Sequence, residues 1–170
     1  ASFSPVNAVA PAETARPIDT RRRPAYIVAV EGDTDYHRNR PLKPFSLLVK
    51  PASADCNLRS TYCFYLDRES LYPETRVHRM SDEVLERMIS TFMAVPMPEY
   101  SIGWQGGEPT LMGLDFFKRV VHYQQKYGRS GASVGNGLQT NGTLIDEEFA
   151  RFLAQYNFLV GVSIDGPAEI

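Results

Sequence analysis

The sequence predicts an α/β protein with a parallel sheet, because four short apolar strands alternate with three amphipathic helices along the chain. The strands are expected to begin near residues 45, 100, 134 and 159. Strand–helix alternation at this spacing is typical of parallel sheets, in which each helix crosses back over the sheet in the right-handed sense. The carboxyl ends of all four strands should therefore lie at one edge of the sheet, with the segments that follow them on one face of the molecule.

The first strand and helix are predicted from residues 45–50 and from the segment that follows Ser81. Residues 45–50 form a short aliphatic run that suits a buried strand. Ser81 is a good N-cap, and Asp82 and Glu83 would occupy the first turn, where the helix dipole stabilises acidic side chains. The apolar stripe that should face the sheet consists of Val84, Leu85, Met88, Ile89 and Phe92.

The later elements follow the same alternation. A second strand is predicted at residues 100–105, an amphipathic helix at 114–127, and a third strand at 134–139. Asp146 should cap the last helix, and the fourth strand is expected at residues 159–163. The apolar side of that last helix consists of Phe149, Phe152, Leu153 and Tyr156.

Composition limits the classes of partner. The 170 residues carry a net charge of −2 with both signs mixed, which provides no broad electrostatic footprint for nucleic acid or for a charged membrane surface. No stretch approaches the roughly 20 apolar residues that span a bilayer. We therefore expect small-molecule or peptide partners, with neither nucleic acid nor membrane among them.

The chain divides at about residue 43. Residues 1–43 are rich in Ala, Pro, Thr and Arg without periodicity, which predicts a flexible leader, whereas residues 44–170 carry the strand–helix pattern of a folded core.

A twin-arginine export signal at Arg21–Arg23 is disfavoured because Pro24 interrupts it and the apolar run that follows is short. Two cysteines are too few for a disulfide scaffold, so a reducing cytoplasm is expected. The chain starts without methionine and stops directly after a turn, so we expect a fragment.

Polar, glycine-bearing segments follow every predicted strand. Glycine supplies turn geometry, and Asn and Asp tolerate left-handed backbone, so each segment alone would be interpreted as an ordinary turn. Their order in the chain carries more information than any one of them. Cys56, Ser60 and Cys63 stand three and then two residues apart after the first strand, in the segment CNLRSTYCFY.

This segment resembles the cysteine motif of radical S-adenosylmethionine enzymes, with Ser60 at the middle cysteine position. Four further segments closely resemble those of anaerobic sulfatase-maturating enzymes: residues 48–52, 105–111, 139–142 and 163–167. The resemblance runs from about Phe45 to Ile170 and does not include the leader. It implies a partial (βα)6 barrel, truncated here after the fourth strand.

The resemblance also implies a chemistry. In that family three thiolates hold a [4Fe-4S] cluster whose open iron binds S-adenosylmethionine. Reductive cleavage, fed by an external electron donor, gives a 5′-deoxyadenosyl radical that starts the oxidation of a Cys or Ser side chain of an unfolded sulfatase to formylglycine. Cys56 and Cys63 would be the cluster ligands here, and the catalytic residues are expected outside this sequence.

The cofactor-binding residues are carried over in the same way. Tyr62 would contact the adenine, and Gly106, Gly107 and Glu108 would receive the methionyl end. Ser163 would reach the ribose and carboxylate region. Three more residues are candidates only for the mouth of the site, and turn formation explains them better than ligand binding does: Gln105, Asn141 and Asp165.

Ser60 keeps a second interpretation open. A neutral hydroxyl is a much poorer iron ligand than a thiolate, so the chain could be a non-catalytic binding module built on the same barrel. A third interpretation is a maturase of another peptide class, because such enzymes share these strand ends. The alternatives differ in iron content and in sequence beyond residue 170.

Overall fold

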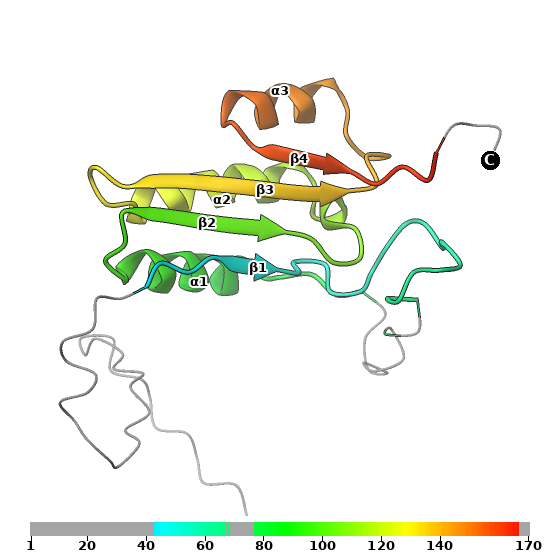
Figure 1. Cartoon of the computed structure of the whole chain (residues 1–170), viewed down its shortest axis with the longest axis horizontal. Coiled ribbons are helices and arrows are strands. Elements are labelled where there is room, and N and C mark those ends of the chain that lie inside the picture. The colour runs from blue at the N-terminus through cyan, green and yellow to red at the C-terminus, as the bar shows by residue number, and fades with distance from the viewer. Residues whose placement is uncertain (1–42, 67, 69–76, 167–170) are drawn as a thin grey trace, which may run out of the picture. The chain divides into compact units, whose positions relative to one another are not determined.

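The computed structural model describes residues 43–66, 68 and 77–166, which contain a four-stranded sheet (Figure 1). The strands are β1 (Leu47–Val49), β2 (Glu99–Trp104), β3 (Ser133–Thr140) and β4 (Leu159–Val162). They lie in the order β1-β2-β3-β4, and every neighbouring pair is parallel. The predicted fold class is confirmed, and each strand begins within two residues of its expected position. The predicted leader, apart from Lys43, lies outside the described residues.

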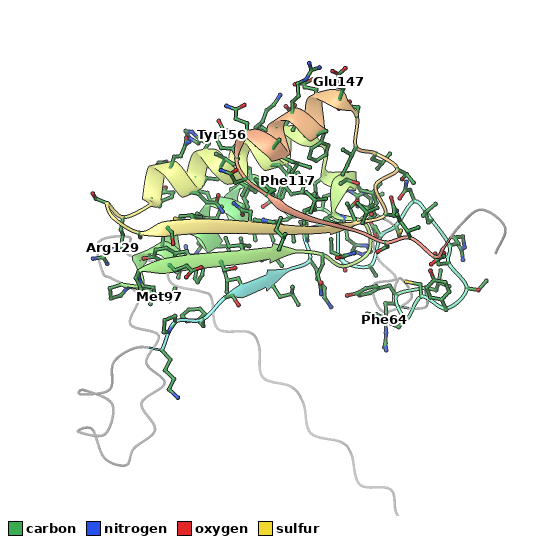
Figure 2. All side chains as sticks on the ribbon, turned by 45° about the horizontal axis from the view of Figure 1, so that its top comes forward. Phe64, Met97, Phe117, Arg129, Glu147 and Tyr156 are labelled. Carbon is green, nitrogen blue, oxygen red and sulfur yellow. The ribbon has the colours of Figure 1, made fainter. Side chains whose placement is uncertain are left out.

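Three α-helices connect the strands and lie on one side of the sheet: α1 (Asp82–Ala94), α2 (Leu114–Tyr127) and α3 (Glu147–Gln155) (Figure 2). A short 3-10 helix, η2 (Pro109–Met112), precedes α2 and was not predicted from the sequence. Within the described ranges, no helix is long and apolar enough to cross a membrane.

The predicted helix starts are confirmed. Ser81 Oγ accepts a hydrogen bond from the Val84 N–H at 3.3 Å, and Asp146 Oδ1 accepts one from the Phe149 N–H at 2.8 Å. Val84 itself was wrongly assigned to the buried stripe of α1, since 53% of it is exposed. Met93 is buried instead, because positions four and eight residues after Leu85 share its face of the helix.

Aromatic side chains fill the layer between the helices and the sheet. Trp104 of β2 is fully buried and meets the rings of Phe116 and Phe117 nearly edge-on, at centroid distances of 5.7 and 6.1 Å. Phe117 also contacts the rings of Phe149 and Phe158, so it joins α2 to α3 and to the approach to β4. Figure 2 shows it between the helices and the strands.

Among the described residues, no helix covers the other face of the sheet, and several positions on this face are glycines. The paired residues Gly103 and Gly137 lie at its centre, between Leu48 on β1 and Leu159 on β4. Both leucines are exposed, by 63% and 79% respectively. We call this surface the open face; it ends at the edge where all four strands terminate.

Replacing Phe117 with alanine tests the packing of the three helices. The substitution removes a fully buried ring from the centre of the aromatic layer, so the free energy of unfolding should fall by about 3–5 kcal/mol in urea titrations. Val84→Ala on the exposed side of α1 is the control and should change it by less than about 0.5 kcal/mol. Equal effects of the two substitutions would contradict the described packing.

Candidate functional site

The segments that follow the four strands converge at one edge of the sheet, as predicted (Figure 1). Hydrogen bonds join them directly: the Glu108 N–H after β2 donates to the Asp55 carbonyl after β1 at 2.7 Å. The side-chain Nδ2 of Asn141, which follows β3, lies 3.8 Å from Cys56 Sγ. The Ser163 N–H after β4 donates to the Thr140 carbonyl at 2.9 Å.

The base of the cysteine-containing loop is fixed by a buried ionic cluster around Asp55. Asp55 Oδ2 accepts hydrogen bonds from the His78 N–H at 2.8 Å and from Arg79 Nη1 at 2.5 Å, and its Oδ1 lies 2.8 Å from His78 Nδ1. Burial raises the pKa of Asp55, but the bonds from His78 and the Arg79 charge outweigh burial and hold the pKa below its ordinary value. Asp55 therefore stays ionised near neutral pH and locks the residue before Cys56.

Two glycines allow the β1 and β2 loops to approach this closely. Gly106 and Gly107 have φ angles of 86° and 49°, in the left-handed region. A Cβ atom on Gly107 would lie 2.1 Å from the Asp55 carbonyl oxygen and 2.8 Å from two main-chain carbons. The close contact that places Asp55 beside Glu108 therefore requires glycine at position 107.

Glu108 is a buried carboxylate at the centre of the strand ends, with 1% of its surface exposed. Its Oε1 accepts hydrogen bonds from the Thr110 N–H at 2.9 Å, the Thr110 hydroxyl at 2.6 Å and the Thr140 hydroxyl at 2.7 Å. Its Oε2 accepts one from the Asn141 N–H at 2.7 Å. The side chain thus joins the start of η2 to the end of β3 through four hydrogen bonds.

A polar clasp holds the first residues of the cysteine loop against the segment after β3. Asn57 Nδ2 donates to the Thr143 hydroxyl at 2.8 Å, and Asn141 Nδ2 donates to Asn57 Oδ1 at 2.9 Å. Asn141 Oδ1 in turn accepts from the Thr143 N–H at 3.0 Å, the geometry of an Asx turn. The start of the loop is therefore held by three polar side chains.

The far part of the loop is tied to the end of β4. The Tyr62 hydroxyl donates to Asp165 Oδ1, although Tyr62 is 72% exposed. This hydrogen bond to a carboxylate raises the pKa of Tyr62, and a weaker one with the Ser60 hydroxyl opposes the shift. Ser60 thus lies beside Tyr62, at the same edge.

The predicted metal ligands give an incomplete set. Cys56 and Cys63 are free thiols of intermediate exposure, and the Cys63 N–H donates to the Ser60 carbonyl at 2.9 Å. In the ranges that the structure covers, no three or more His, Cys, Asp or Glu side chains are grouped so as to hold a metal ion. The loop offers two thiols and one hydroxyl.

The remaining predicted residues lie at the same edge. The Gln105 N–H donates to the Val49 carbonyl at 3.0 Å, and the Ser163 hydroxyl accepts from Gln139 Nε2 at 3.0 Å. Sequence reasoning missed Asn57, Thr143 and Gln139 as partners within the site. The position of Asn57 directly after Cys56 was the only signal for it.

Comparisons with known proteins agree with this geometry. Residues 51–170 match the family described as the Radical SAM superfamily. The chain is 48% identical over 132 residues to a cysteine-type anaerobic sulfatase-maturating enzyme of Clostridium perfringens, covering 76% of this chain and 35% of that enzyme. It is 45% identical over 128 residues to a serine-type anaerobic sulfatase-maturating enzyme of Bacteroides thetaiotaomicron, covering 75% and 31%.

Solved structures give the same result. The structure described as native anSMEcpe with bound AdoMet superposes with a TM-score of 0.68 at 48% identity, covering 75% of this chain and 35% of that one. A second, with bound AdoMet and the Cp18Cys peptide, gives a TM-score of 0.66 at 47% identity, covering 75% and 33%. The chain therefore spans about a third of the length of the relatives that it matches.

Gly107→Ala tests the contact between the β1 and β2 loops. Main-chain atoms must move to admit the new methyl group, so we expect the free energy of unfolding to fall by at least about 3 kcal/mol in urea titrations. Gly131→Ala is the matched control, because its φ of 81° is also left-handed but no atom lies within 4 Å of the position that a Cβ atom would take. It should cost only the left-handed penalty of about 1–2 kcal/mol. Similar losses in both variants would contradict the tight contact at Gly107.

Proposed function

Because this chain belongs to the radical SAM superfamily, we propose that residues 44–170 are the cofactor-binding part of a peptide-modifying enzyme of the sulfatase-maturating type. The observation that carries the proposal is the convergence of four strand ends, with the cysteine loop held against the segment after β3 by Asn57 and Asn141. The similarity to both cysteine-type and serine-type sulfatase-maturating enzymes supports the same function.

Members of this superfamily use a [4Fe-4S] cluster and S-adenosylmethionine. The donor set of this chain does not fit a cluster held by three thiolates, because Cys56 and Cys63 supply two thiols and Ser60 a neutral hydroxyl. Serine would have to lose its proton to approach the donor strength of a thiolate, which is unfavourable at neutral pH. We therefore assign no reaction step to a cluster in this chain.

S-adenosylmethionine is proposed to bind at the polar strand ends. We assign its adenine to the neighbourhood of Tyr62, its methionyl end to the main chain of Gly106 and Gly107, and its ribose and carboxylate region to Ser163. The assignment of Glu108 to the methionyl end involves its main chain, because its carboxylate is buried and already accepts four hydrogen bonds.

The substrate that we propose is a Cys or Ser side chain on an unfolded sulfatase segment, oxidised to formylglycine in the whole enzyme with electrons from an external donor. The open face is consistent with an extended substrate, because its central positions are glycines. The proposed compartment is a reducing cytoplasm, supported by the two free cysteines.

One observation favours a second function. The serine at position 60 leaves the loop without its third thiolate, which suits a barrel that binds S-adenosylmethionine or a peptide without radical chemistry. The hydrogen bonds around Asn57 and Asn141 would keep the loop ordered in that case too. Iron binding separates the two functions.

Ser60→Cys tests whether the missing thiolate limits the site. After anaerobic reconstitution with iron and sulfide, the chain as it stands should retain well under four iron atoms, whereas Ser60→Cys should approach four and gain the broad visible absorbance of an iron–sulfur cluster. Ser130→Cys is the matched control, since it adds the same thiol in the loop before β3, at the other end of the sheet, and should bind no more iron than the parent.

Two results would contradict this account. Four iron atoms in the unsubstituted chain would show that Ser60 is not limiting. An iron content in Ser60→Cys that stays at the level of Ser130→Cys would favour the non-catalytic binding module.

A further inference from the structure

The side chain of Gln139 lies across β4, at the end of the open face where the strands terminate. Gln139 of β3 pairs with Gly161 of β4 in the parallel register. A Cβ atom on Gly161 would lie 2.3 Å from Gln139 Oε1 and 3.2 Å from its Cδ. The glutamine amide therefore occupies the space in which any larger residue at position 161 would place its side chain.

From this position the glutamine reaches the hydroxyl of Ser163, which stands two residues after Gly161 and directly follows β4. Gln139 Nε2 donates to Ser163 Oγ at 3.0 Å, and this is the hydroxyl's one hydrogen bond among the described residues. The Ser163 N–H donates to the Thr140 carbonyl at 2.9 Å, so the main chain of the serine is held as well. Both contacts come from consecutive residues of β3.

The direction of this hydrogen bond fixes what the serine can offer to a ligand. A serine hydroxyl has one hydrogen to donate and two lone pairs that accept. Because one lone pair of Ser163 Oγ is used by the Gln139 amide, its hydrogen is left for another acceptor. Ser163 is exposed at the edge where the strands end, so this acceptor can come from solution.

We propose that Gln139 is a positioning residue, seated over Gly161, which holds the Ser163 hydroxyl as a hydrogen-bond donor to an oxygen atom of S-adenosylmethionine. The acceptor is an oxygen of the methionyl carboxylate or of the ribose. This inference rests on the proposed function, and it assigns to Gln139 and Gly161 a part in cofactor affinity. Gly161 is required because a side chain there would displace the glutamine amide.

A double-mutant cycle tests the coupling between the two side chains. Binding of radiolabelled S-adenosylmethionine to the whole chain is measured by equilibrium dialysis for the parent, Gln139→Ala, Ser163→Ala and the double variant. Each single substitution should weaken binding by about 3- to 10-fold, the value of one hydrogen bond. The double variant should bind no more weakly than Ser163→Ala, because Gln139 acts through the serine.

Glycine substitutions supply a second route to the same result. Gly161→Ala should weaken binding as much as Gln139→Ala and should add nothing in the Gln139→Ala background, since the displaced amide is then absent. Gly135→Ala is the matched control on the same face of β3, because no atom lies within 4 Å of the position that its Cβ atom would take. Its affinity should equal that of the parent, and thermal unfolding of every variant checks that the fold is retained.

Two analogues identify the acceptor: decarboxylated S-adenosylmethionine, and the analogue without the ribose 2′ and 3′ hydroxyls. The analogue that lacks the acceptor should bind equally well to the parent and to Ser163→Ala. If Gln139→Ala weakens binding equally with and without Ser163, the inference is wrong while the proposed function stands. If the parent chain binds no S-adenosylmethionine at all, both are wrong.

Discussion

The arrangement of the strand ends depends on one buried charge, the carboxylate of Glu108. A carboxylate with 1% exposure is tolerated only when it is fully hydrogen-bonded, and Glu108 accepts four bonds from Thr110, Thr140 and Asn141. Those donors belong to the segment after β2 and to the end of β3. Because Oε1 accepts from both Thr110 and Thr140, and Oε2 accepts from the Asn141 N–H, the carboxylate binds the two segments into one structural unit.

The cysteine loop is positioned from this unit. The Asn141 N–H donates to the Glu108 carboxylate, and the Asn141 side-chain Nδ2 donates to Asn57 Oδ1 and reaches Cys56 Sγ. On the other side, the Asp55 carbonyl accepts the Glu108 N–H, and the Asp55 side chain holds His78 and Arg79. Side-chain contacts thus hold the residues on either side of Cys56, namely Asp55 and Asn57.

Periodicity in the sequence predicted most of the framework. The four strands and three helices follow from apolar spacing, and the caps at Ser81 and Asp146 follow from residue type, because these signals are local. Val84 was misassigned because it lies about 100° away from Leu85 around the helix, on the side turned away from Ile89 and Met93. The short helix η2 was missed because four residues give no periodic signal.

The site was predicted only in part, for a physical reason. Segment order placed Cys56, Glu108, Asn141 and Ser163 at one edge, but the contacts between them join residues that are far apart in sequence. Asp55 and His78 are separated by 23 positions, and Asn57 and Thr143 by 86. The packing of the chain determines such pairs. The family resemblance gave Glu108 a place at the methionyl end of the cofactor, but it gave no sign of the hydrogen bonds that the buried carboxylate makes.

Hydrogen exchange of the Asn141 amide in Glu108→Gln tests the central claim, that this buried carboxylate organises the strand ends. Glutamine keeps the shape of the side chain but replaces one accepting oxygen with an NH2 group that donates. At least one hydrogen-bond donor of the site therefore faces another donor and loses its acceptor. The account predicts that this amide exchanges about 10- to 100-fold faster, while the Gln105 amide, bonded to Val49 rather than to Glu108, exchanges at nearly the parent rate. Unchanged protection of Asn141 in the folded variant would contradict it.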